Sequence, residues 1–448
     1  MAEMTGREQK EEALLQELWQ FPLLRAIFGR RARRFALGME IPEGALAYRS
    51  RHQPLPLTEL EQAVLIAAAT GVTGWNFGIP YTPTTGGVAN YPVRLGGRTF
   101  PTGAGVGSAE LFYTDDEGTY LVRTRDLAPA RQREVEEAGD VERLLEGCRR
   151  ATVKLSDQRL HLPREYPHIF EHNRWNANFP GSTLFIPVFD MSEYFLSVLA
   201  IVVQQGQVLL DDYAGNVPAG DLGPFLRSGL LQERRRALLS LVEQEVVTSA
   251  ATSLAVMGHN IVLVLQAMGL GGWMYTGINP YSILGLYAER GVPGLGFRFL
   301  RDPRWPLPNP VGLDGLLEGL CPPYHPDMAA AVAELARRKF GPGGAFDPET
   351  PGPFRDNAAV KGSVARYSPE LQACIVEMAR YVYETYGRIP PRSPTWLVSV
   401  LVQAQHIDTE FYDTYFQAGA YLETHARHLE RWHAAVPQPL AAGEVGVR

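Results

Sequence analysis

The sequence predicts a mixed α+β fold built around one long central helix. Residues 246–268 are apolar or small on nearly every side, interrupted mainly by His259, Asn260 and Gln266, which is typical of a helix packed on most of its circumference. Residues 109–114 and 119–123 flank the turn sequence DDEG and predict a β-hairpin. Residues 328–340, 368–386 and 396–433 carry helical patterns. Helices and strands therefore contribute to a mixed core, and the length of the chain favours more than one structural unit.

Composition limits the class of protein. The chain has 448 residues, of which 45% are hydrophobic and 20% charged, with a formal net charge of −7. This gives no electrostatic reason to expect nucleic acid or an anionic membrane as partner. The three cysteines are widely spaced without a CxxC motif, which favours a reducing compartment. With no signal peptide or transmembrane segment recognised in the sequence, we expect a cytoplasmic protein.

A possible anion site precedes the first strongly predicted helix. Residues 9–35 indicate one or two short helices and end in an arginine cluster that we interpret as structural. Arg49, Ser50 and Arg51 then precede a helix that begins at Thr58, a favourable N-cap, and runs through Ala69. Guanidinium and hydroxyl groups both suit phosphate oxygens, so this stretch is a candidate phosphate site.

The central helix ends in a glycine-rich exit at Gly269, Gly271 and Gly272. Glycines are favoured where the backbone needs positive φ or close clearance. A flat cofactor can lie against such bare backbone, but an ordinary helix C-cap explains the glycines equally well. Both interpretations stay open at this point.

The remaining segments suggest coverings of a site and two possible metal positions. Residues 128–153 indicate a charged surface or dimer-contact helix, and residues 161–178 a polar loop over an active site, favoured over a metal site. Residues 294–299 predict a strand, and the proline-rich residues 301–326 an irregular cap. On the predicted C-terminal helix, His425 pairs with His428 and His406 with Glu410. These pairs are only fragments of a carboxylate–histidine bundle pattern, so no metal ligands are assigned.

Three motifs in this order resemble the nitroreductase superfamily, nearest to the branch of SagB-type dehydrogenases. The first is YRSR at 48–51 followed by PLPLT at 54–58 and a helix ending in GVTG at 71–74. The second is PTGAG at 101–105 running into AELFY at 109–113. The third is Asn260 followed by QAMGLGG at 266–272. The resemblance spans about residues 45–299, with an unmatched middle at about 128–240.

The resemblance implies a fold, a cofactor and site residues. It implies an antiparallel sheet flanked by helices and a homodimer around the central helix, with FMN at the subunit interface. Arg49, Ser50 and Arg51 would contact the FMN phosphate and ribityl chain. The ring would lie near five further residues: Thr102, Gly103, Gly105, Gly271 and Gly272. Catalytic residues stay unassigned, with Tyr275, Trp175 and His172 as candidates chosen by polarity and aromatic character.

The resemblance also divides the chain. We expect an N-terminal helical extension at 1–44, a nitroreductase-like core at 45–300 with an insertion at about 128–240, and a proline-rich cap at 301–365. An additional helical region would follow at 366–435 and a flexible tail at 436–448.

The favoured function is an FMN-dependent oxidoreductase acting on a small-molecule or peptide substrate, with NAD(P)H as candidate reductant. The alternative is a catalytically inactive scaffold of the same fold that binds a ligand or partner protein. A metal protein built on the C-terminal histidines is a third hypothesis.

Overall fold

The computed structural model describes residues 6–79, 89–125, 127 and 141–433. Its centre is a seven-stranded sheet in the order β12-β17-β8-β5-β6-β7, with β16 also paired to β8. Every neighbouring pair in this sheet is antiparallel. The strands are β5 (Ala109–Asp115), β6 (Gly118–Val122), β7 (Thr152–Ser156), β8 (Thr183–Asp190), β12 (Gly271–Tyr275), β16 (Trp396–Leu397) and β17 (Leu401–Gln405). The mixed α+β class predicted from the sequence is confirmed.

The middle strands are buried on both faces. On β8, Phe185 and Phe189 belong to one core cluster, whereas Leu184 and Ile186 belong to another on the opposite face. Successive side chains of a strand point to opposite faces, so a strand covered on both sides becomes apolar throughout. The predicted hairpin is confirmed as β5 and β6, with Asp115 paired to Gly118 across the turn.

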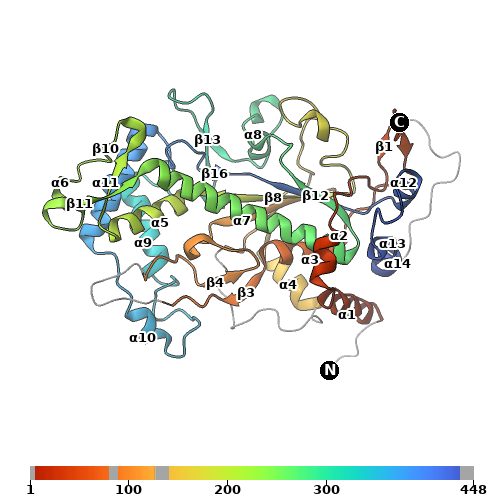
Figure 1. The fold of residues 1–448 in the computed structure, drawn as a ribbon, viewed down its shortest axis with the longest axis horizontal. Coiled ribbons are helices and arrows are strands. Elements are labelled where there is room, and N and C mark those ends of the chain that lie inside the picture. The colour runs from red at the N-terminus through yellow and green to blue at the C-terminus, as the bar shows by residue number, and fades with distance from the viewer. Residues whose placement is uncertain (1–5, 80–88, 126, 128–140, 434–448) are drawn as a thin grey trace.

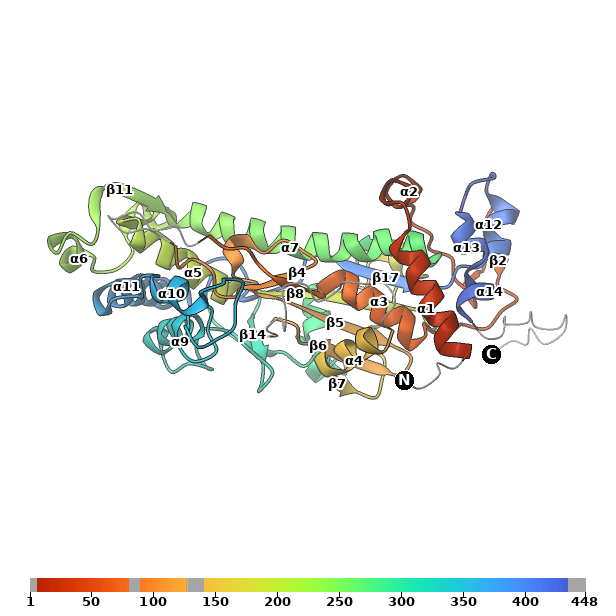
Figure 2. The same ribbon diagram turned by 90° about the horizontal axis from the view of Figure 1, so that it is seen from below.

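Helix α7 (Leu239–Met268) is the central helix, and Figure 2 shows it running along one long side of the molecule. It packs on α3 (Glu59–Thr70), α5 (Met191–Gln204) and the sheet. Among the described residues α7 is also the one helix whose length and composition would allow it to cross a membrane. In this fold it covers the sheet of a mixed core instead.

Sequence signals at the helix ends are reproduced. Thr58 caps α3 and forms a reciprocal capping box with Glu61, which satisfies two otherwise free backbone donors. Helix α7 ends at Gly269, whose φ of +89° is left-handed. The predicted helix at 328–340 is α9 (Met328–Phe340), and the one at 368–386 is α11 (Pro369–Tyr386).

The predicted helix over 396–433 is wrong in its first part. Residues 396–405 form β16 and β17, and β17 occupies the position between β8 and β12. Val402 and Ala404 join the buried core, while Gln403 donates to Gln405 at 2.8 Å on the same strand. A five-residue strand with both faces covered cannot be distinguished by pattern from a buried helix segment. Short helices follow: α12 (Thr409–Tyr415), α13 (Glu423–Ala426) and α14 (His428–Trp432).

The opposite face of the sheet is covered by short elements of the second core cluster. They include α8 (Pro280–Leu284) and a three-stranded sheet of β13 (Arg298–Leu300), β14 (Asn309–Leu313) and β15 (Leu317–Glu318). The proline-rich stretch, expected to be irregular, therefore contains two strands. The strand expected at 294–299 begins only at Arg298.

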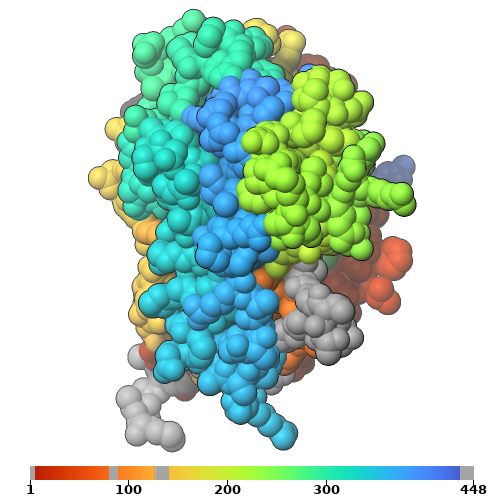
Figure 3. Space-filling model, turned by 90° about the vertical axis from the view of Figure 1, so that its left-hand side faces the viewer, coloured from red at the N-terminus to blue at the C-terminus, as the bar shows by residue number. Residues whose placement is uncertain are grey.

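One end of the molecule is a lobe of residues 207–238 (Figure 1). It contains β9 (Gln207–Asp211), β10 (Val217–Pro218), α6 (Gly223–Arg227) and β11 (Gln232–Leu238). Figure 3 shows this yellow-green lobe against the blue α11. Tyr381 and Tyr386 of α11 donate to Asp211 at 3.0 and 2.7 Å. Helix α11 also packs on α5 and α9, which joins the C-terminal half to the core.

The remaining elements are short or lie at the N-terminal side. They are α1 (Gly6–Trp19), α2 (Leu23–Gly29), β1 (Glu40–Ile41), β2 (Tyr48–Arg49), β3 (Val72–Trp75), β4 (Gly96–Arg98), α4 (Val141–Ala151) and α10 (Asn357–Gly362). Among the described residues, four single turns of 3-10 helix complete the list at Gly103–Gly105, Glu171–Asn173, Asp212–Ala214 and Ala288–Arg290. The predicted charged helix at 128–153 is described only from Val141, and the predicted tail at 436–448 lies outside the described residues.

Candidate functional site

The predicted phosphate residues lie at the end of the sheet where β17 leaves it. Arg49 pairs with Glu40 between β1 and β2, and their side chains are 3.7 Å apart. Ser50 is buried, and its backbone N–H donates to the Met39 carbonyl at 2.9 Å. Arg51 forms an ion pair with Glu410 at 2.6 Å. Both arginines are largely exposed, so these ion pairs contribute little to stability. Each arginine can therefore release its glutamate partner and bind another anion.

Gly271 and Gly272 lie at the same end of the molecule, in the edge strand β12. A Cβ on Gly271 would meet Ile407 at 2.1 Å, and one on Gly272 would meet the Gln403 carbonyl oxygen at 2.1 Å. Close packing within the chain therefore already requires glycine at both positions. The space expected for a flat cofactor on the Cβ side of these residues is filled by the protein itself.

Thr102, Gly103 and Gly105 lie beside the N-terminal half of α7, away from the other predicted residues. Ser253 of α7 donates to the Pro101 carbonyl at 3.1 Å, and a Cβ on Gly103 would meet the Tyr194 hydroxyl at 2.3 Å. At a rise of 1.5 Å per residue, Ser253 lies about 22 Å from the end of α7. One chain thus does not bring the two predicted groups together.

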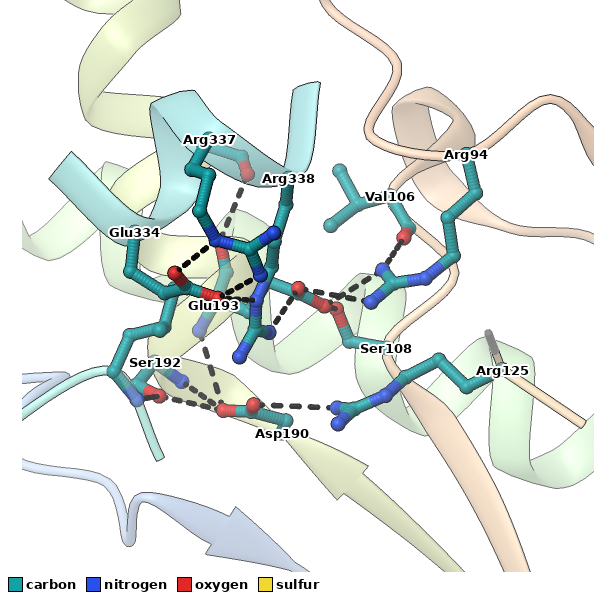
Figure 4. Close-up of polar contacts among 12 residues, drawn as sticks. Arg94, Val106, Ser108, Arg125, Asp190, Ser192, Glu193, Glu334, Arg337 and Arg338 are labelled. Carbon is teal, nitrogen blue, oxygen red and sulfur yellow. Dashed lines mark hydrogen bonds and ion pairs between the residues drawn. The ribbon is translucent and has the colours of Figure 1, made fainter. Parts of the chain in front are cut away.

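A buried network of ion pairs, not anticipated from the sequence, lies between β8, α5 and α9 (Figure 4). Glu193 is fully buried and accepts hydrogen bonds from Arg94 at 2.9 Å, Arg338 at 2.7 Å and Ser108 at 2.6 Å. Burial acts to raise the pKa of Glu193, but the surrounding arginines hold it well below its usual range. Glu193 is therefore a charged group of the core, and removing one of its partners would leave a buried charge uncompensated.

Asp190 is the second carboxylate of this network and the N-cap of α5. It accepts from the Ser192 hydroxyl at 2.6 Å and lies 3.4 Å from Arg125. Burial raises its pKa, opposed by Arg125. Because the arginines and carboxylates come from separate segments, no local sequence motif could have indicated this network.

A cleft of about 250 Å³ opens beside this network. Its lining includes Arg94, Arg125, Arg337, Arg338 and Lys361. Each of these cations already has a carboxylate or carbonyl partner: Lys361, for example, donates to the Thr350 carbonyl at 2.7 Å. The volume lies below the usual range for cofactor pockets. We therefore interpret the cleft as the edge of a structural ion-pair network.

Comparison with known proteins adds a weak structural likeness. No protein-family model and no curated protein sequence matches the chain. Among solved structures, a candidate nitroreductase of Ralstonia eutropha JMP134 matches with 14% identity and a TM-score of 0.25, covering 58% of this chain and 71% of that chain. A TM-score this low transfers neither an architecture nor a function.

Two of the candidate catalytic residues, Tyr275 and His172, lie at or near the end of β12. Tyr275 stacks on Trp273 with ring centroids 5.0 Å apart, and its buried hydroxyl has no hydrogen-bond partner among the described residues. A Cβ on the neighbouring Gly277 would meet His172 at 3.1 Å. Trp175, in the 161–178 loop that also carries His172, is 39% exposed. The loop at 161–178 is largely irregular, as expected. Nδ1 of His168 forms a hydrogen bond with the Ser282 hydroxyl at 2.9 Å.

The C-terminal histidines do not form the pairs expected from helix spacing. His406 follows strand β17 and is not on a helix, and Glu410 forms an ion pair with Arg51. Instead His406, His428 and His433 all lie against Glu61 in the first turn of α3. Nothing near Glu61 in the chain pointed to histidine partners.

Proposed function

We propose that the chain is an FMN-dependent oxidoreductase of nitroreductase-like type whose cofactor sites are completed in a homodimer. The observation that carries this proposal is the uncovered face of α7 (Figure 2). Thr248, Thr252 and His259 are exposed along it, and Ala255 and Leu263 are half-buried. Between Thr248 and Leu263 the helix carries no Asp, Glu, Lys or Arg, whereas the solvent-facing side of a surface helix usually carries charged residues.

Helix α2 extends the same surface. Four of its seven residues are large, apolar and well exposed: Leu23, Leu24, Ile27 and Phe28. Phe28 is 75% exposed, and α2 packs beside α7. Clustered exposed apolar side chains mark interaction surfaces more often than free surface. A second copy of the chain is the partner that the resemblance implies.

A two-fold axis across α7 would also unite the separated site residues. Isologous pairing places the N-terminal half of one α7 beside the C-terminal half of the other. Thr102, Gly103 and Gly105 of one copy would then approach the end of the molecule that carries Arg49, Arg51 and Gly271 in the other. The arginines would hold the phosphate, and bound flavin would supply hydride or electron transfer.

One observation favours the alternative of an inactive scaffold. The spaces beside Gly103, Gly271 and Gly272 are filled by atoms of the same chain. A protein of this fold that has lost its flavin would show such filling. The alternative predicts a colourless protein that does not take up added FMN.

The test measures FMN binding by the purified full chain and by an Arg49→Ala variant. Binding is detected as a decrease in flavin fluorescence. We expect the variant to bind FMN at least ~10-fold more weakly, since one charged hydrogen bond to phosphate contributes about 1.5–3 kcal/mol. Arg150→Ala, an exposed arginine of α4, is the matched control and should bind as the parent does. Equal binding by Arg49→Ala and the parent would contradict the phosphate assignment.

A further inference from the structure

Four metal-ligating side chains from three distant segments meet at one point. Glu61 lies in the first turn of α3, His406 follows β17, and His428 and His433 belong to and follow α14. The Oε1 atom of Glu61 lies 2.7 Å from Nε2 of His428 and 3.3 Å from Nε2 of both other histidines. Nε2 of His406 and Nε2 of His433 are 3.1 Å apart. Four ligand atoms therefore face a common centre, all within 4.8 Å of one another.

The cluster is buried and its members are held from outside. Glu61 has 0% exposure, and His406 and His428 have 3% each. Nδ1 of His406 faces the Leu55 carbonyl at 2.9 Å, and Nδ1 of His428 faces the Met268 carbonyl at 2.8 Å. The second oxygen of Glu61 accepts the Thr58 backbone N–H at 2.6 Å. Such outer contacts to carbonyls are the usual way in which proteins orient metal-binding imidazoles.

These outer contacts determine which groups face inward. A neutral imidazole has one N–H, and in His406 and His428 the carbonyl contact places it on Nδ1. Nε2 of both rings then presents a lone pair toward Oε1 of Glu61, which is also an acceptor. Converging lone pairs in a dry site repel one another unless a positive charge lies between them. A shared cation resolves this conflict without adding a proton to either ring.

The spacing and the donor set favour zinc. Zinc binds imidazole nitrogen at about 2.0–2.1 Å and carboxylate oxygen at about 2.0–2.2 Å, almost always with four ligands in structural sites. A tetrahedron of that size has edges of about 3.3 Å, close to the four nitrogen–oxygen and nitrogen–nitrogen contacts of 2.7–3.3 Å given above. Three imidazoles suit zinc or a neighbouring transition metal better than magnesium or calcium.

We propose that Glu61, His406, His428 and His433 form a binding site for one divalent transition-metal ion, best matched by Zn²⁺. With four protein ligands the site is closed, which indicates a structural role. The ion joins α3, the end of β17 and α14, so it fastens the C-terminal segment to the core. This role goes beyond the proposed flavin chemistry and does not depend on it.

The test is metal content and Zn²⁺ affinity of the full chain, purified without a histidine tag. We expect one Zn²⁺ per chain by elemental analysis, or uptake of one added Zn²⁺ after chelator treatment. His433→Gln should bind Zn²⁺ at least ~100-fold more weakly, since even outer-shell changes cost 10–100-fold. His433 is the ligand at the rim of the cluster, with 11% side-chain exposure. His161→Gln, in an exposed loop, is the matched control and should bind as the parent does.

The visible absorption of bound Co²⁺ provides a second test, which does not depend on the stability or activity of the protein. Co²⁺ bound in place of zinc should give the intense visible absorption of a tetrahedral site, and Glu61→Gln should shift or abolish it. A parent chain that neither contains nor takes up Zn²⁺ or Co²⁺ would overturn the proposal. Unchanged Zn²⁺ affinity in both His433→Gln and Glu61→Gln would overturn it as well.

Discussion

At the scale of single residues, the most unusual group outside the proposed sites is Lys339. Its side chain is 1% exposed, and Nζ lies 2.6 Å from the Tyr367 hydroxyl and 3.3 Å from the Tyr91 carbonyl. No described carboxylate pairs with it in an ion pair, and burial lowers the pKa of Lys339 to about 7. The folded protein therefore disfavours the charged form that the unfolded chain prefers.

This shift predicts a pH dependence of stability. Between about pH 7 and the ordinary lysine pKa of 10.5, the unfolded chain binds a proton that the folded chain does not, so the free energy of unfolding should rise with pH. The rise is at most a few kcal/mol. In urea unfolding experiments between pH 7 and 9, Lys339→Met should reduce the rise of the free energy of unfolding with pH. The exposed Lys154→Met is the control and should keep the slope; equal slopes in all three proteins would contradict the assignment.

At the scale of elements, the C-terminal end of α7 shows how the C-terminal segment of the chain is positioned. Gly269 has a φ of +89°, and a Cβ there would lie 2.1 Å from the Thr424 carbonyl oxygen and 2.8 Å from the His425 backbone nitrogen. Helix α13 therefore rests directly on the backbone of the helix end. The bare glycine serves a contact within the chain, in addition to ending the helix.

Gly269→Ala should destabilise the protein by more than ~2 kcal/mol, because the strain of positive φ adds to a backbone clash that no side-chain rotation relieves. Gly291→Ala separates the two effects. Its φ is +80°, but nothing lies within 4 Å of the added Cβ, so only about 1 kcal/mol is expected. Chemical denaturation of both variants makes the comparison. Similar losses in the two would show that the Thr424 contact is unimportant.

Prediction from sequence worked where local chemistry decides structure. The hairpin turn before Gly118, the Thr58 cap and the small, apolar surface of α7 are properties of neighbouring residues. It failed at β17, because pairing with β8 and β12 depends on segments over a hundred residues away. For the same reason the C-terminal histidines could be recognised individually from the sequence, whereas their convergence on Glu61 could not.

At the scale of the whole molecule, the surface formed by α2 and α7 predicts self-association. Leu24→Glu combined with Phe28→Glu should convert a dimer to a monomer, because burying two carboxylates in an apolar interface without partners is costly. Leu307→Glu, at an exposed apolar position outside this surface, is the control and should stay dimeric. Light scattering over a series of protein concentrations measures the molar mass of each variant in solution. A dimer that survives the double substitution would place the interface elsewhere.

The measurement that tests the central claim most directly is sedimentation velocity of the FMN-treated full chain, recorded together at protein and visible flavin absorbance. The proposal requires the flavin site to be shared between two copies. It predicts that flavin absorbance sediments with a species of twice the chain mass, with one flavin per chain. Flavin that sediments free of protein, or with a monomer, would contradict the account.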